Sequence, residues 1–203
     1  MLFAVPADAD PMAVAEAVRS RLPRLADEVE RRRRGGGEPI KELVGGASFA
    51  YLGRRHRLKV VPADPSSLVR LHQGWLELPE SGSWQQGAQL IAEWYAARGC
   101  RWTAARALPL AERIGVAPSE VTVRDLGARW GSCEPDGSIV LHWALMQLPP
   151  SLVDLVLVHE LTHLKVSAHG AAFRHRMRMI LTDLDALERR FAEAEPTLWR
   201  GAV

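Results

Sequence analysis

The sequence predicts an α+β fold with an antiparallel β-rich N-terminal part followed by a mainly helical part. Between residues 46 and 80, apolar residues alternate with polar ones, which is the pattern of half-buried strands. From residue 83 onward, apolar residues mostly recur every three or four positions, which is the pattern of amphipathic helices. We therefore expect four parts, which are listed in chain order as residues 1–45, 46–82, 83–195 and 196–203.

Residues 1–45 are predicted to form a helical extension. Asp10 and Pro11 can start a helix, because aspartate caps helix N-termini and proline suits the first helical position. The run of four arginines from Arg31 to Arg34 is followed by three glycines, which favours a helix end at this point.

Residues 46–82 are predicted to form two β-hairpins. The first pairs residues 48–52 with 56–61 around Gly53, and the second pairs residues 68–71 with 75–78 across a glycine-containing turn. We expect an antiparallel sheet.

Residues 83–195 are predicted to combine helices with a third hairpin. Ser83 can cap a long helix that reaches about residue 114. Short β runs at residues 121–124 and 138–141 are expected to pair around the turn at 134–137, with residues 129–133 on the loop side. Two further helices are predicted, one starting near Pro150 and one spanning residues 171–191. Residues 196–203 carry no pattern and are expected to be a tail.

Composition favours a compact protein of a reducing compartment. Of the 203 residues, 47% are hydrophobic, which is enough for a sizeable core. The net charge of +2 permits anionic partners without implying them. Two cysteines suggest no disulfide framework, and neither a signal peptide nor a membrane span is evident, so a cytoplasmic location without membrane contact is expected.

The strongest chemical signal is a His-Glu-x-x-His motif. His159 and His163 are four residues apart, so on a helix both imidazoles project from one face, about one turn (~5.4 Å) apart. This spacing suits two ligands of one Zn²⁺ ion, and Glu160 between them can act as general base on a water bound to the metal. The motif therefore predicts a zinc-dependent hydrolase.

A third ligand is expected, because catalytic zinc usually takes three protein ligands and leaves one position for water. His169 lies six residues after His163, which is the spacing of metzincin-type sites, although Val166 stands where those sites have glycine. The alternatives are carboxylates on the last helix, namely Asp183, Asp185 and Glu188.

Negative charge that develops on the substrate also needs a hydrogen-bond donor. Arg129 and His142 are favoured, because both flank the hairpin that immediately precedes the motif helix, and Lys165 is a further candidate. The alternative for Arg129 is a salt bridge, and for His142 a structural hydrogen bond within its strand.

Several segments together resemble the YgjP-like zinc metallopeptidase family, which is related to SprT-like and WLM proteins. The resemblance covers roughly residues 46–195 and rests on Arg-Trp-Gly-Ser-Cys at 129–133, His-Glu-Leu-Thr-His at 159–163 and His-Gly-Ala-Ala-Phe at 169–173. It implies a zincin-like fold, zinc on His159, His163 and His169, and Glu160 as catalytic base. The family usually has asparagine where His142 stands and tryptophan where Arg174 stands, and these departures concern substrate contacts rather than the metal site.

The resemblance favours a metalloendopeptidase that acts on a peptide or protein substrate. Two alternatives remain, because activated water on zinc attacks other electrophiles. One is a metal-dependent hydrolase of nucleotide phosphoanhydrides. The other is a nucleic-acid-associated SprT-like protein that uses the Arg31 to Arg34 run as a tether, although no nucleic-acid-binding motif supports it. The sequence carries no indication of oligomeric state.

Overall fold

The computed structural model describes residues 39–64 and 67–203, which share one continuous hydrophobic core. Side chains from the β-rich segment and from the helical part, such as Phe49, Ile91 and Leu157, belong to the same buried cluster. The core also reaches upstream of residue 46, because Leu43 is buried and the Lys41 N–H donates to the Ala202 carbonyl. The predicted N-terminal helix and the Arg31 to Arg34 run lie outside the described residues.

The N-terminal sheet contains both predicted hairpins. Its four strands are β1 (Ser48–Tyr51), β2 (Arg54–Val61), β3 (Arg70–His72) and β4 (Trp75–Pro79). The order is β1-β2-β4-β3, and both hairpin pairs are antiparallel as predicted, whereas the central pair β2–β4 is parallel. One face of the sheet supplies Phe49, Leu58 and Leu76 to the core, which explains the alternation of apolar residues in this segment.

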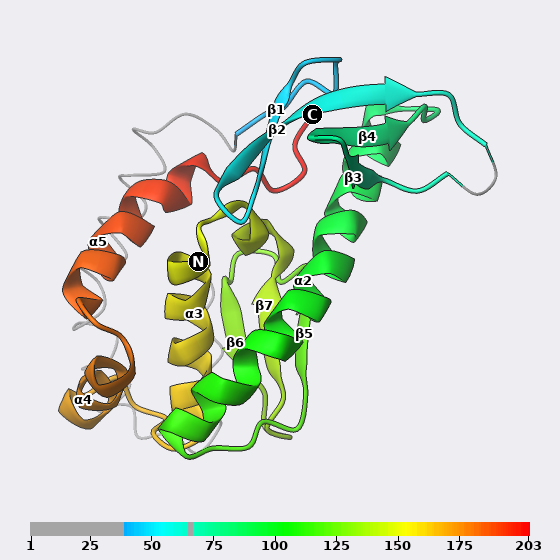
Figure 1. The fold of residues 1–203 in the computed structure, drawn as a ribbon. Coiled ribbons are helices and arrows are strands. Elements are labelled where there is room, and N and C mark those ends of the chain that lie inside the picture. The colour runs from blue at the N-terminus through cyan, green and yellow to red at the C-terminus, as the bar shows by residue number, and fades with distance from the viewer. Residues whose placement is uncertain (1–38, 65–66) are drawn as a thin grey trace, which may run out of the picture. The chain divides into compact units, whose positions relative to one another are not determined.

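The long helix α2 (Trp84–Ile114) runs from the N-terminal sheet to the second sheet (Figure 1), and it contacts β4 of the first and β5 of the second. Its start is confirmed, because the Ser83 hydroxyl accepts a hydrogen bond from the Gln86 N–H, which is the interaction of an N-cap. The helix remains continuous through Pro109 and ends at Gly115 in the left-handed conformation.

The second sheet corrects the predicted third hairpin. Its strands are β5 (Val121–Arg124), β6 (Gly131–Cys133) and β7 (Ile139–His142), in the order β5-β7-β6. The pair β5–β7 is parallel, and the partner of β7 across the turn at 134–137 is β6. The last three residues of the Arg-Trp-Gly-Ser-Cys segment are therefore an edge strand, whereas Arg129 and Trp130 lie in the loop before it.

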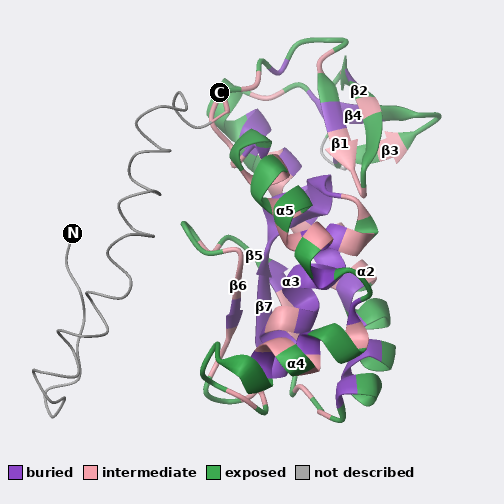
Figure 2. Cartoon of the chain, turned by 90° about the vertical axis from the view of Figure 1, so that its left-hand side faces the viewer, coloured by how far each residue is buried: buried purple, intermediate pink, exposed green. Residues whose placement is uncertain are grey.

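The motif helix α3 (Pro150–His163) lies at the centre of the helical part. It contacts β6 and β7 on one side and α4 and α5 on the other, and it follows the short 3₁₀ helix η1 (Trp143–Gln147). Figure 2 shows α3 mostly buried, whereas the outer faces of α2 and α4 are exposed. The apolar run that precedes the motif supplies the buried faces of α3. The polar side chains of the motif are therefore surrounded mainly by protein and need polar partners.

The predicted helix over residues 171–191 is two helices, α4 (Ala171–Ile180) and α5 (Leu184–Ala194). The break comes at Leu181, which is extended, and at Asp183, which has the left-handed φ of 58°. The two helices are held together by Arg174, whose guanidinium pairs with the carboxylates of Asp185 (2.7 Å) and Glu188 (3.2 Å).

The C-terminal residues form part of the core. After the 3₁₀ helix η2 (Glu195–Thr197), the side chain of Trp199 is 0% exposed and packs edge-on against Phe49 and Trp143. Its carbonyl accepts a hydrogen bond from the buried Gln147 amide (2.7 Å). The expected tail therefore joins the N-terminal sheet to η1.

We expect Trp199→Ala to lower the free energy of unfolding by about 3–5 kcal/mol, because it removes a fully buried aromatic side chain. Urea denaturation measures this loss. The matched control is Trp84→Ala, since Trp84 is 57% exposed, and it should change stability by less than about 1 kcal/mol. Equal effects of the two substitutions would contradict a core role for the C-terminal residues.

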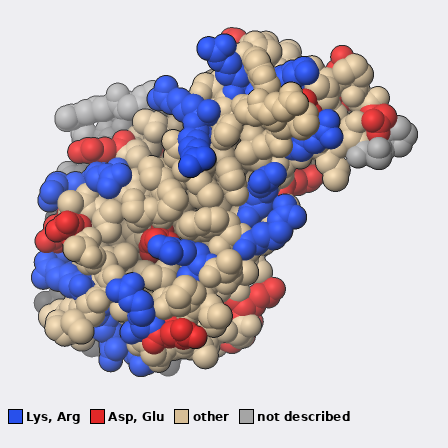
Figure 3. All heavy atoms as spheres, viewed as in Figure 1, with Lys and Arg blue, Asp and Glu red and all other residues tan. Residues whose placement is uncertain are grey.

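The surface carries mixed charge. On the face shown in Figure 3, lysine and arginine side chains occur in separate groups with acidic side chains among them. This face of the described residues thus lacks the continuous basic stripe that follows a nucleic-acid backbone. Within residues 39–64 and 67–203, no helix combines the length and apolar character that crossing a membrane requires.

Candidate active site

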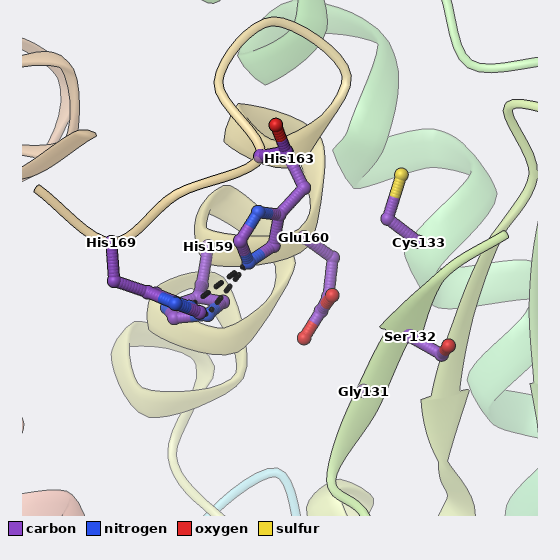
Figure 4. Close-up of a pocket in the computed structure, with 8 residues that line it drawn as sticks. Gly131, Ser132, Cys133, His159, Glu160, His163 and His169 are labelled. Atoms are coloured by element: carbon purple, nitrogen blue, oxygen red, sulfur yellow. Dashed lines mark hydrogen bonds between the residues drawn. The ribbon is translucent and has the colours of Figure 1, made fainter. Parts of the chain in front are cut away.

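Helix α3 brings His159 and His163 to one face, as their spacing predicts. Their Nε2 atoms are 3.2 Å apart. His169 follows α3 in the loop before α4, and its Nε2 atom lies 3.1 Å from that of His163 and 3.0 Å from that of His159. Three imidazoles from two segments therefore converge on one point (Figure 4).

The convergence of the three Nε2 atoms fits a metal ion. Two imidazoles can share one proton, but three nitrogens in a triangle cannot all be satisfied by hydrogen bonds to one another. Ligands at Zn–N distances of about 2.0–2.1 Å in a tetrahedral site are separated by about 3.3 Å, which is close to the spacing of these atoms. Imidazole nitrogen is also a donor that zinc prefers.

The Val166 carbonyl and the Phe173 ring hold the three imidazole rings in place. The Nδ1 atom of His163 lies 3.2 Å from the Val166 carbonyl, so an N–H there directs Nε2 toward the centre. The Phe173 ring, which is 2% exposed, packs against all three imidazoles with centroids 4.7–4.9 Å apart. Burial, together with the neighbouring histidines, lowers the pKa of His159 to about 4, so this ring is neutral near pH 7 and can donate its lone pair.

Glu160 projects from α3 toward strand β6 (Figure 4). Its side chain is buried, and the backbone N–H of Cys133 donates a hydrogen bond to the carboxylate. Burial raises the pKa of Glu160 to about 7, while the charge of Arg129 and the Cys133 hydrogen bond oppose this shift. A cation at the three histidines would lower this pKa in the same way as Arg129. Burial is thus the largest effect on this carboxyl group, and a bound cation would favour its charged form, which is the form that can accept a proton.

Gly131 is a site residue that sequence reasoning missed. A Cβ atom at this position would lie 2.5 Å from Oε1 of Glu160 and 2.7 Å from its Cγ. Only glycine allows β6 to approach the glutamate this closely. A glycine within the Arg-Trp-Gly-Ser-Cys segment can indicate a close approach of another group to the backbone. That the group is Glu160 becomes evident only from the position of β6 beside α3.

We expect Gly131→Ala to displace Glu160 and to lower kcat by about 100-fold, since a 1 Å misplacement of a reacting group can have this effect. Overpacking should also lower the free energy of unfolding by about 1–3 kcal/mol. The control is Gly45→Ala, because nothing lies within 4 Å of a Cβ atom there. Peptide hydrolysis and urea denaturation measure both effects, and normal kcat in Gly131→Ala would refute the close approach.

Arg129 lies at the mouth of the site. Its guanidinium is exposed, donates to the Ser132 hydroxyl (3.0 Å), and lies near enough to Glu160 to affect its pKa. The structure therefore brings Arg129 together with the motif residues.

His142 occupies a different environment. It is 1% exposed, its Nδ1 accepts a hydrogen bond from the Ala144 N–H (3.0 Å), and its Nε2 lies 3.4 Å from the Asp125 carboxylate. Burial and the charge of Arg200 lower its pKa to about 4. Both ring nitrogens thus have partners within the protein, Nδ1 at the start of η1 and Nε2 at Asp125 just after β5, which favours the structural alternative for His142 over a donor to substrate.

The rival carboxylate ligands lie outside the histidine cluster. Asp185 and Glu188 pair with Arg174, and Asp183 precedes α5 at the break between the helices. Among the described residues, the group with ligand atoms close enough for one metal ion consists of His159, His163 and His169.

Glu160 and the three histidines of the cluster border a cavity of about 470 Å³ that is open to solvent. Strand β6 forms the opposite wall with Gly131, Ser132 and Cys133 (Figure 4). A substrate in this cavity would contact the histidine cluster on one side and an edge strand on the other.

An α+β fold in which His159, Glu160 and His163 of one helix meet His169 from the following loop is the arrangement expected of a metallopeptidase. A family model described as YgjP-like, metallopeptidase domain, matches residues 2–194, and the chain belongs to this family. The match starts well upstream of residue 46, so it includes most of the N-terminal extension. The chain is a hydrolase whose family implies a metal cofactor.

Other comparisons add a structural neighbour. The chain is similar to the crystal structure of the metallopeptidase zymogen of Pyrococcus abyssi abylysin, with 21% sequence identity and a TM-score of 0.40. The similarity covers 48% of this chain and 95% of that one. No curated protein matches the sequence.

Proposed function

We propose that this protein is a zinc-dependent endopeptidase in which His159, His163 and His169 hold the metal ion and Glu160 is the general base. The observation that carries the proposal is the convergence of three Nε2 atoms within 3.2 Å of one another. Three nitrogen ligands with an open side toward solvent are the arrangement of catalytic rather than structural zinc.

The reaction needs a nucleophilic water, a proton acceptor and a donor for the developing negative charge. Zinc, when bound, lowers the pKa of water and polarises the substrate carbonyl. Glu160 takes the proton from the attacking water and later transfers it to the leaving nitrogen. Arg129 is the group that can donate to the substrate oxygen, because its guanidinium is exposed beside Glu160.

Strand β6 offers a binding surface for an extended peptide. It lies at the edge of its sheet. On one side of it the Trp130 carbonyl accepts from the His142 N–H of β7, and on the other the Glu134 N–H donates to the Ser138 carbonyl just before β7. By the alternation of an antiparallel ladder, the backbone groups of Gly131 and Cys133 point away from β7. The Cys133 N–H is used by Glu160, and the Gly131 N–H and carbonyl are in position to pair with substrate by β-augmentation.

Peptide is the substrate favoured by this geometry. A nucleotide would need cationic groups that cradle phosphates, whereas neither lysine nor arginine is among the described residues that line the cavity at the histidine cluster. An edge strand beside the metal ligands instead suits a polypeptide that continues on both sides of the bond to be cut. We therefore propose internal peptide bonds as the target.

The test is a paired screen of zinc-loaded protein against a peptide library and a panel of nucleoside triphosphates. We expect cleavage within peptides and no release of phosphate or pyrophosphate. Glu160→Gln, prepared in parallel, identifies any contaminating activity. Turnover of nucleotides by the wild type but not by Glu160→Gln would contradict the peptidase assignment while retaining the metal site.

A further inference from the structure

A second cavity of about 440 Å³ adjoins the metal site. The two cavities share three lining residues, Gly131, His159 and Glu160, so they meet at the reacting groups. The second cavity differs in its walls, which are mainly apolar. Its apolar walls are formed by Trp130, Leu155, Val156, Met177 and Phe191.

Helix α3 itself places this cavity beside the reacting groups. Leu155 is four residues before His159, and Val156 is four residues before Glu160, so each lies one turn along the same helix face. The helix thus presents apolar side chains and then the metal-site residues in direct succession. An extended chain that reached the histidine cluster would meet these apolar side chains next.

The remaining walls are held rigidly. The Trp130 indole N–H donates to the Glu195 carboxylate (2.8 Å), its ring stacks under the Arg200 guanidinium at 3.8 Å, and Phe191 packs edge-on against it at 6.0 Å. These contacts fix the position of the Trp130 indole in the wall of the second cavity, although the residue is only half-buried. Glu188 reaches the rim of the cavity, but its charge is paired with Arg174.

We propose that this cavity is the specificity pocket of the enzyme and that it accepts a large apolar side chain, aromatic or long aliphatic, adjacent to the scissile bond. The proposal rests on the proposed peptidase function and adds the class of residue that the enzyme selects. A volume of about 440 Å³ is within the range of ligand pockets, which is roughly 300–1,000 Å³, and is ample for one side chain. Burial of apolar surface supplies the selectivity.

Ala128 allows the pocket to be filled without disturbing the core. It lines the cavity from an exposed loop position, so Ala128→Phe would place a ring in the pocket. The matched control is Ala117→Phe, because Ala117 is also exposed in a loop and lines neither cavity. Both variants should bind the same amount of zinc as the wild type.

The measurement is the affinity of zinc-loaded protein for two hydroxamates, by calorimetric titration. Both probes offer the same metal-binding group, but 3-phenylpropanohydroxamate carries an apolar arm that acetohydroxamate lacks. We expect the wild type and Ala117→Phe to prefer the phenyl compound by about 10- to 100-fold, and Ala128→Phe to lose most of this preference. In the peptide screen, the same variant should lose cleavage next to large apolar residues more than next to alanine or glycine.

The outcomes separate this inference from the proposed function. Peptide cleavage without apolar preference, or an equal preference for the phenyl compound in Ala128→Phe and wild type, would overturn the pocket assignment and leave the peptidase intact. A phenyl preference that Ala128→Phe abolishes, in a protein that cleaves no peptide, would support the pocket and refute the peptidase.

Discussion

Glu160→Gln is expected to lower kcat for peptide hydrolysis by about 10²- to 10⁴-fold while zinc content and folding stay close to wild type. Glutamine has nearly the same shape, and its side-chain oxygen can still accept the hydrogen bond from the Cys133 N–H. It cannot take a proton from water, however. The loss should therefore appear in kcat, because the metal ligands and the substrate-binding surfaces are unchanged.

Steady-state kinetics on one cleavable peptide, with zinc measured by mass spectrometry, tests this expectation. Glu112→Gln is the matched control, since Glu112 is an exposed residue on the outer part of α2. If Glu160→Gln retained more than about a tenth of wild-type kcat, another group would have to act as the base.

His163→Ala is expected to remove zinc binding. The Nε2 atom of His163 lies within 3.2 Å of those of both other histidines, and its Nδ1 faces the Val166 carbonyl, which orients the ring toward the cluster. Loss of a partner that only orients a ligand lowers metal affinity by about 10- to 100-fold, so removal of a ligand should exceed this range. Competition with a fluorescent zinc chelator measures the affinity.

The control for that experiment is His175→Ala, because His175 is exposed on α4 and lies outside the cluster. Its zinc affinity should equal that of the wild type. Zinc binding by His163→Ala with wild-type affinity would show that the metal binds elsewhere.

The convergence of His159 and His163 could be predicted, because it depends mostly on local spacing. The helical positions of His159 and His163 bring their rings together regardless of the rest of the fold. His169 was predicted from its separation along the chain, whereas the choice between it and the carboxylates of α5 required the structure. In the structure Asp185 and Glu188 pair with Arg174, which favours His169 as the proposed third ligand.

Errors arose where strand pairing or a single backbone angle decides the outcome. A run of three residues, Gly131–Cys133, is too short to show an alternating pattern, so β5 was assigned as the partner of β7 instead. The apolar stripe of α4 continues in phase into α5, and the extended conformation of Leu181 and the left-handed φ of Asp183 separate the two helices. Sequence periodicity contains neither kind of information.

Contacts between residues that are distant in the sequence could not be predicted either. Trp199 is one aromatic residue in a segment without periodicity, and its burial depends on Phe49 and Trp143, which are distant in sequence. Gly131 is required by the side chain of Glu160, which approaches from another element. His142 lies beside the motif helix in sequence, but its ring nitrogens are directed to Ala144 and Asp125.

X-ray absorption at the zinc edge of the metal-loaded wild type tests the central claim most directly. The three converging imidazoles predict one zinc per chain with three nitrogen ligands and one further light atom at about 2.0–2.1 Å. Cys133 also borders the cavity, and a sulfur ligand would be seen at about 2.3 Å. A zinc–sulfur distance, or fewer than three imidazoles around the metal, would contradict the site described above.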